Sequence, residues 1–270
     1  MTTPEVDGLP LVAPNPRGLL GEVRLLREVP RLAVSAPRLL LAPRGRSRVV
    51  VLPGYTSSDR ATAPLRWYLR RLGHDVHGWG LGTNTGDVEA LLPQVVDVVR
   101  GHHDASGHPV HLVGWSLGGV LAREVAREEP TMVAQVITYG TPVVGGPKYT
   151  VAAASYGPEA VERIATEAER RNAVPIEVPV TALYSREDRV VAWAACIDRH
   201  NESAEHVEVF SSHAGMGIDP DVWTHVAARL TRRCRRPRTS RSRVGRGSTQ
   251  KEALQSRVWC RCVTVRWCCR

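Results

Sequence analysis

A glycine-rich segment near the middle of the chain carries the clearest chemical signal in the sequence. Residues 114–119 read GWSLGG and directly follow the apolar run VHLV. Between a strand and a helix, a serine flanked by glycines lies on a tight turn that projects its hydroxyl above the edge of the sheet. The same turn leaves the amide of Leu117 at a helix N-terminus, where it can donate to a developing oxyanion. The motif therefore predicts that Ser116 is a nucleophile.

A histidine is needed next, because a serine hydroxyl is a poor nucleophile at neutral pH without a base. His213 lies in the segment SSHAG, after the late apolar run VEVF and before the last helical pattern. The base of a strand–turn–helix serine site is expected at this place in the chain order. His225 falls inside the last helix, and His200 and His206 lie before the run. We predict His213 as the base and keep His200 and His206 as alternatives.

A carboxylate should orient the histidine and stabilise its charged form. The loop after the apolar run VTALY contains both Glu187 and Asp188. Asp188 is preferred, because a short carboxylate four residues beyond the strand can reach inward while the following valines resume packing. Glu187 stays the alternative, and either acid is also compatible with a solvated loop charge paired to Arg186 or Arg189.

A second donor to the oxyanion is expected from the loop after the early apolar run RVVVL. That loop begins Pro53-Gly54-Tyr55. Gly54 permits a sharp turn and a close approach of the backbone, so the amide of Tyr55 can face Ser116. A plain Pro-Gly turn is the alternative interpretation.

Short apolar runs alternate with amphipathic stretches between about residues 48 and 231. The expected strands are Arg48–Leu52, Asp75–Trp79, Val110–Val113, Val136–Tyr139, Val180–Tyr184 and Val207–Phe210. The expected helices are Ala63–Leu72, Val88–Val99 (which Pro93 starts or kinks), Leu117–Glu129, Glu159–Arg171 and Asp219–Leu230. Strand–helix alternation at this spacing predicts crossover connections. The predicted fold is a single α/β domain with a mostly parallel, doubly wound sheet.

Two segments interrupt or precede this alternation. Residues 142–179 form an insertion that predicts either a short cap over a pocket or an ordinary crossover with a long loop. Residues 1–37 are expected to form an N-terminal extension with a helix near Gly18–Glu28, and the run Arg38–Ala42 is expected to add an edge strand. The hydrolytic chemistry would then reside in residues 38–231.

The charge of the chain is concentrated at one end. The formal net charge is +9, but residues 231–270 carry 13 Lys and Arg and one Glu, whereas residues 1–230 carry 23 basic and 26 acidic residues. The basic pI is therefore no argument that the body binds nucleic acid. The basic composition of residues 232–270 predicts either a disordered tail or a segment that binds an acidic partner.

Cysteine follows the same division, since only Cys196 lies outside the last 37 residues. One cysteine excludes a disulfide scaffold for the body. The N-terminus has neither the basic region nor the apolar run of a signal peptide, and no apolar stretch is long enough to cross a membrane. We therefore expect a cytoplasmic protein without a transmembrane segment.

With these residues in place, the chain resembles the α/β-hydrolase superfamily, and within it the small bacterial lipase- and esterase-like members. The resemblance rests on the GWSLGG turn, on LPGY followed by Asp59, and on residues 79–86 (WGLGTNTG) with Asn84, whose role the sequence does not explain. Many relatives carry His-Gly where this chain has Pro53-Gly54. The cap is short compared with the lids of secreted lipases.

The resemblance implies hydrolysis of a carboxylic ester by Ser116, Asp188 and His213, with the amides of Tyr55 and Leu117 as oxyanion donors. Apolar residues at the site, among them Trp115 and Val143, favour a small-molecule ester with an acyl chain. No metal or organic cofactor is required. An acyltransferase or thioesterase using the same residues stays open, as does a non-catalytic binding module. The sequence does not indicate an oligomeric state.

Overall fold

The computed structural model describes residues 5–6, 9–15 and 22–231, and its largest element is a parallel sheet of six strands. The strand order is β4-β3-β5-β6-β7-β8. The strands are β3 (Arg48–Leu52), β4 (Asp75–Gly78), β5 (Val110–Trp115), β6 (Val133–Tyr139), β7 (Val180–Tyr184) and β8 (Glu205–Glu208). Two further short strands, β1 (Glu5–Val6) and β2 (Leu9–Pro10), pair with each other in antiparallel fashion. All six predicted strands are confirmed.

Helices connect the strands in the order that the sequence predicts. They are α1 (Leu25–Leu40), α2 (Asp59–Arg71), α3 (Val88–Ser106), α4 (Leu117–Glu128), α5 (Pro158–Asn172) and α6 (Pro220–Thr231). One detail of the prediction is corrected, because Pro93 does not start its helix. The side chain of Asp87, six residues before Pro93, accepts a hydrogen bond from the amide of Ala90 at 3.0 Å and caps α3.

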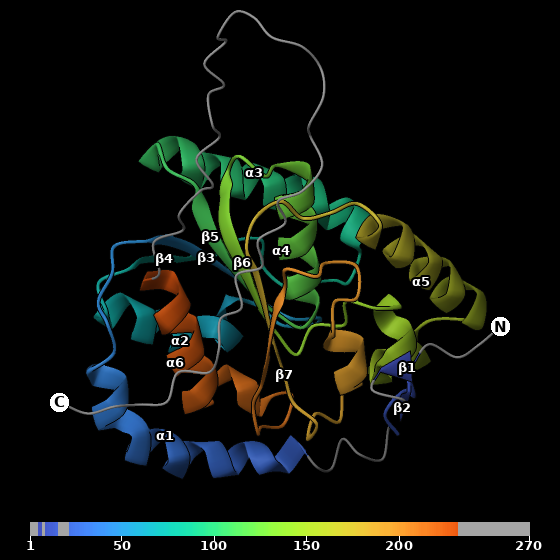
Figure 1. The fold of residues 1–270 in the computed structure, drawn as a ribbon, viewed down its shortest axis with the longest axis horizontal. Helices are drawn as coiled ribbons and strands as arrows, with labels where there is room; N and C mark the ends of the chain where they lie inside the picture. The colour runs from blue at the N-terminus through green and yellow to red at the C-terminus, as the bar shows by residue number, and fades with distance from the viewer. Residues whose placement is uncertain (1–4, 7–8, 16–21, 232–270) are drawn as a thin grey trace, which may run out of the picture. The chain divides into compact units, whose positions relative to one another are not determined.

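The sheet is buried on both faces, as a doubly wound fold requires. Successive residues of β3 point to opposite sides: Val49 and Val51 pack in one core cluster, and Val50 and Leu52 pack in the other. The first cluster also contains side chains of α2 and α6, and the second contains side chains of α3 and α4. Figure 1 shows these helices on the two sides of the strands.

The N-terminal prediction is wrong for the run Arg38–Ala42, which forms no strand. Of the helix expected near Gly18–Glu28, residues 18–21 lie outside the described residues, residues 22–28 are helical, and α1 continues to Leu40. Residues 38–40 of the run RLLLA form the last turn of α1, in which Leu39 packs into the core cluster beside α2 and α6, whereas Leu40 and Leu41 are exposed. A short apolar run has the same composition in a buried strand and in a helix, so the sequence alone did not distinguish them.

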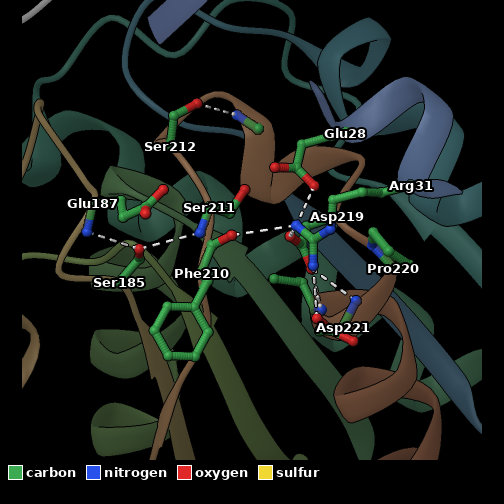
Figure 2. Close-up of polar contacts among 12 residues, drawn as sticks. Glu28, Arg31, Ser185, Glu187, Phe210, Ser211, Ser212, Asp219, Pro220 and Asp221 are labelled. Atoms are coloured by element: carbon green, nitrogen blue, oxygen red, sulfur yellow. Dashed lines mark hydrogen bonds and ion pairs between the residues drawn. The ribbon is translucent and has the colours of Figure 1, made fainter. Parts of the chain in front are cut away.

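Ion pairs fix α1 to the start of α6. Arg31 lies between three carboxylates, with a nitrogen 2.5 Å from Glu28, 2.9 Å from Asp219 and 2.8 Å from Asp221 (Figure 2). Arg38 also contacts Asp221, at 2.9 Å. Most of α1 falls within residues 1–37, which we expected to be an extension, and it packs on the body of the fold. The basic tail predicted at 232–270 lies outside the described residues.

The strand order reverses at β3, and this reversal places the site. From β3 the chain moves outward to β4 and then returns to the other side of β3 as β5. Leu52, the last residue of β3, is in register with Gly114 of β5. The loops that follow these two strands therefore leave the same edge of the sheet side by side, and the crevice at such a reversal is where open α/β sheets bind ligands.

Candidate active site

Ser116 lies on the tight turn between β5 and α4, in a backbone conformation that is rare for a residue with a side chain. Its φ is 53° and its ψ is −124°. A Cβ on Gly114 would overlap the backbone of Gly119, and one on Gly118 would overlap the carbonyl of Leu52. The glycines at these two positions are therefore a steric requirement of the turn, which explains the GWSLGG pattern.

Hydrogen bonds hold the strained turn from both sides. The amide of Ser116 donates to the carbonyl of Tyr139 at 2.9 Å, and the carbonyl of Ser116 accepts from the hydroxyl of Thr141 at 2.9 Å. Both partners come from the end of β6 and the residues just after it. A strained conformation persists only where its surroundings determine it, and such positions cluster at functional sites.

His213 and Asp188 form a buried pair beside this turn. Nδ1 of His213 lies 2.7 Å from Oδ2 of Asp188, and the two residues are only 5% and 6% exposed. The other carboxylate oxygen, Oδ1, accepts hydrogen bonds from the amides of Val190 and Val191, each at 2.8 Å. With its carboxylate held in this way, Asp188 can fix the orientation of the imidazole.

The alternative candidates lie elsewhere. Glu187 has a half-exposed side chain that lies 3.9 Å from Arg24. His200 contacts Glu169, and His206 accepts a hydrogen bond from the amide of Asp198. In the described part of the chain, His213 is the only histidine that lines the large pocket above the sheet.

The electrostatic surroundings of His213 favour its charged form. Burial by itself lowers the pKa of His213, but the charge of Asp188 and its hydrogen bond outweigh this effect, and the charge of Glu22 adds to them. The net result is a pKa raised above the usual value of histidine. A raised pKa makes the imidazole a stronger base toward a hydroxyl proton.

The pocket above the sheet brings most of the predicted site residues together. Its volume is about 1440 Å³, and its wall includes Ser116, Leu117, Tyr55, Trp115, Val143 and His213. The ring of Trp115 lies 5.7 Å from the ring of His213, measured between centroids. Asp188 lies behind His213, away from the wall. The arrangement places the hydroxyl residue, the imidazole and both predicted oxyanion donors around one space.

The segment between β6 and β7 contributes residues to the wall of this pocket. It contains the short helices η2 (Gly146–Tyr149) and η3 (Val151–Ser155) and the helix α5. Val151, Ile164 and Arg171 of this segment contribute to the pocket wall. The amide side chain of Asn172, at the end of α5, donates to the carbonyl of Val143 at 2.7 Å and ties α5 to the strand edge. The short cap over the pocket stays a prediction.

The loop after β3 touches the turn of Ser116, and Asn84 holds this loop in place. A Cβ on Gly54 would lie 3.1 Å from Cβ of Ser116. The buried side chain of Asn84 donates to the carbonyl of Pro53 at 2.9 Å, and its backbone carbonyl accepts from the amide of Thr56 at 2.8 Å. Asn84 thus fixes both sides of Tyr55, which gives a structural role to a residue that the sequence left unexplained.

The sequence missed two residues that contact the histidine loop. Glu22 accepts hydrogen bonds from the backbone amides of His213 and Ala214, at 3.3 and 2.9 Å, and also lines the pocket. Gly140 has a φ of 58°, and a Cβ on it would lie 3.0 Å from Nδ1 of His213. A glycine after a strand was a visible signal for Gly140, whereas nothing in the sequence connects Glu22 with the site.

No protein among curated sequences matches the chain. The family model described as "Alpha/beta hydrolase family" matches residues 36–255. The chain belongs to the alpha/beta hydrolase family. This family assignment supports a hydrolase.

Several solved structures share the fold of this chain at low sequence identity. A metagenome-derived lipolytic enzyme is 18% identical with a TM-score of 0.53, over 70% of this chain and 95% of that one. A monoacylglycerol lipase from Paleococcus ferrophilus is 15% identical with a TM-score of 0.52, over 69% and 96%. A thioesterase domain from the curacin biosynthetic pathway is 15% identical with a TM-score of 0.50, over 71% and 91%. These likenesses concern the fold of this alpha/beta hydrolase.

The described residues contain neither a metal-binding cluster nor a membrane-spanning helix. They contain no cluster of three or more His, Cys, Asp or Glu side chains placed to hold a metal ion. None of their helices is both long enough and apolar enough to cross a membrane.

Proposed function

We propose that this alpha/beta hydrolase cleaves carboxylic esters through an acyl-enzyme intermediate, with Ser116, His213 and Asp188 as its catalytic triad. The observation that carries the proposal is the buried His213–Asp188 pair, 2.7 Å apart, whose histidine lies on the wall of the pocket that the strained turn of Ser116 also lines. A nucleophile, a base and an orienting acid in this relation are the components of acyl transfer.

In the proposed reaction, Oγ of Ser116 attacks the ester carbonyl while Nε2 of His213 takes the hydroxyl proton. The tetrahedral oxyanion accepts hydrogen bonds from the amides of Leu117 and Tyr55. The carbon–oxygen bond to the alcohol then breaks, and His213 gives its proton to the departing alcohol. Water attacks the acyl-enzyme in the same way, which releases the carboxylic acid and returns the proton to Ser116.

An acyl chain is the substrate group that the pocket wall favours. Trp115 and Val143 lie beside the serine turn, and Val151 and Ile164 of the predicted cap extend the apolar wall. Burial of apolar surface stabilises a bound chain in proportion to the area covered. The lipolytic enzyme and the monoacylglycerol lipase that share the fold are consistent with such a substrate. A cytoplasmic location stays a prediction.

Thioester cleavage is the second candidate, since the same residues would perform it and a thioesterase domain shares the fold. Competing reactions with an ester and a thioester of the same acyl group measure the preference directly. Transfer of the acyl group to an alcohol is detected in the same assay by adding the alcohol and measuring the new ester.

Labelling by a fluorophosphonate tests the catalytic proposal. We expect the wild-type protein to be labelled and to hydrolyse p-nitrophenyl esters, and the Ser116→Ala variant to do neither. Ser203→Ala is the matched control, because Ser203 is an exposed serine on the loop before β8. Labelling that persists in Ser116→Ala, or no labelling of a folded wild-type protein, would overturn the proposal and favour a non-catalytic binding module.

A further inference from the structure

The helix α1 exposes an apolar face that the site does not use. Of ten exposed large apolar side chains in the described residues, six lie between residues 23 and 41. These are Val23, Leu26, Val29, Val34, Leu40 and Leu41, each at least 55% exposed. Pro30, Ala33 and Pro37 are exposed between them. We call residues 23, 26, 29, 30, 33, 34, 37, 40 and 41 the outer face of α1.

This face follows from how α1 is fixed to the fold. Its opposite side buries Glu28 and Leu39, and Leu32 packs against the core cluster beside α6. The contacts of Arg31 with Glu28, Asp219 and Asp221 hold that side inward (Figure 2). At 3.6 residues per turn, the residues of the outer face must then point away from the protein.

Arginines border the outer face, and acids are excluded from it. The segment 22–46 contains six arginines and two glutamates. Of the glutamates, Glu28 is buried and Glu22 accepts hydrogen bonds from the histidine loop. Arg24, Arg27 and Arg38 follow one edge of the helix, and Arg44 and Arg46 are exposed just beyond its end. Arg24 and Arg38 also contact Glu187 and Asp221.

We propose that the outer face of α1 docks the protein on the surface of a membrane that contains anionic phospholipid. An exposed apolar face with arginines along its edge is the pattern of helices that lie in the plane of a lipid interface. The apolar side chains enter the boundary between headgroups and acyl chains, and the arginines contact the phosphates. The proposal concerns binding to a surface and does not depend on the catalytic proposal.

The positive charge along the edge of the outer face favours an anionic membrane over two other possible partners of this face. A second copy of the chain would bring another arginine-bordered face against the first, with like charges along the contact. The C-terminal segment 231–270, with 13 Lys and Arg and one Glu, has the same sign of charge as the border of α1. An anionic lipid surface is complementary to both the apolar and the basic parts of the face.

Docking would also bring the pocket close to the lipid. Glu22, which lies one helical turn before Leu26, is on the pocket wall. A surface in contact with the beginning of the outer face is therefore adjacent to the pocket, where an acyl ester could pass from the membrane into the site.

Co-sedimentation of the full chain with vesicles tests the proposal. The probes are vesicles of phosphatidylcholine alone and vesicles of phosphatidylcholine with phosphatidylglycerol. We expect the wild type to bind the anionic vesicles, and the double variant Leu26→Glu with Val34→Glu to bind at least about tenfold more weakly, because two apolar side chains that would be buried in the lipid are replaced by charged ones. Val174→Glu is the matched control, since Val174 is 53% exposed and lies two residues after the end of α5.

Three outcomes would overturn the proposal. Equal binding by the wild type and the double variant would assign vesicle binding to the basic tail. No binding of the wild type to anionic vesicles would exclude lipid as the occupant. A wild type that is dimeric without vesicles, with a monomeric double variant, would assign the face to a second copy. Hydrolysis of a short, water-soluble ester should be the same in the wild type and the double variant, which separates this test from the catalytic one.

Discussion

The carboxylate of Glu22 accepts a hydrogen bond from the backbone amide of His213 at 3.3 Å, although 191 residues separate them in the sequence. The same carboxylate accepts from the amide of Ala214 at 2.9 Å. Glu22 therefore orients the loop of the proposed catalytic base and adds a negative charge next to it.

Removing the charge of Glu22 should shift the pH dependence of hydrolysis. The base is active when His213 is neutral, so activity rises with pH through the pKa of His213, which Asp188 and Glu22 raise. In Glu22→Gln that pKa falls, and the acid limb of the kcat/KM profile should move to lower pH. Glu89→Gln is the control, since Glu89 also lines the pocket but does not raise the pKa of His213. An unmoved limb would contradict the electrostatic role of Glu22.

The choice between the two acids can be tested by a pair of conservative variants. Asp188→Asn leaves the shape of the side chain but removes the charge that orients His213, and kcat should fall by about 10³–10⁴-fold. Glu187→Gln changes a half-exposed side chain near Arg24 and should leave kcat nearly unchanged. Measuring kcat for both with a p-nitrophenyl ester decides the matter. A larger loss in Glu187→Gln would reverse the assignment.

We expect residue 140 to require glycine because of its contact with His213, and not only because of its positive φ. Gly140→Ala places a Cβ 3.0 Å from Nδ1 of His213 at a φ of 58°, so both stability and kcat should fall. Gly107→Ala is a close control, because Gly107 has a φ of 66° and open space around it. It should cost about 1–2 kcal/mol of stability without loss of kcat. Equal kcat in the two folded variants would show that Gly140 does not position His213.

Asn84 should act through the loop that carries Tyr55. Asn84→Asp replaces the donor to the Pro53 carbonyl with a carboxylate in a fully buried position, which leaves two acceptors facing each other. The displaced loop should lower kcat more than it raises KM, because the amide of Tyr55 is proposed to stabilise the transition state. A change in KM alone would assign Asn84 to substrate binding instead.

The buried Glu28 should make stability depend on pH. Burial and the nearby charge of Asp219 raise the pKa of Glu28 from 4.5 to about 7, although Arg31 opposes the shift. The folded state therefore holds a proton that the unfolded state releases, and this contribution to stability is complete below about pH 4.5 and is lost as pH rises to about 7. Glu28→Gln should show a smaller decrease of Tm from pH 5 to pH 8 than the wild type.

The control for this measurement is Glu128→Gln, since Glu128 is exposed at the end of α4. It should reproduce the pH dependence of the wild type. A wild-type Tm that rises steadily over the same interval would contradict the protonation of Glu28 in the folded protein.

Local pattern by itself determined the sheet and the serine turn. The strands β3, β5, β6 and β7 are short apolar runs, and the geometry of residues 114–119 depends on glycines within that segment. The order of the loops along the chain also predicted Asp188 and His213 as the acid and the base, and these residues follow β7 and β8. These features are readable because they depend on neighbours in the sequence and on the few ways in which strands and helices connect.

Only the tertiary structure decided what depends on contacts between distant segments. The apolar composition of the run 38–42 is compatible with both a strand and a helix. The packing of Leu39 beside α6 decides in favour of the helix. The separation of Glu187 from Asp188, the role of Asn84 and the contact of Glu22 with His213 each depend on where a second segment lies in space. Sequence patterns record which faces are apolar, but they do not record which distant polar groups meet, because those pairs carry no periodicity.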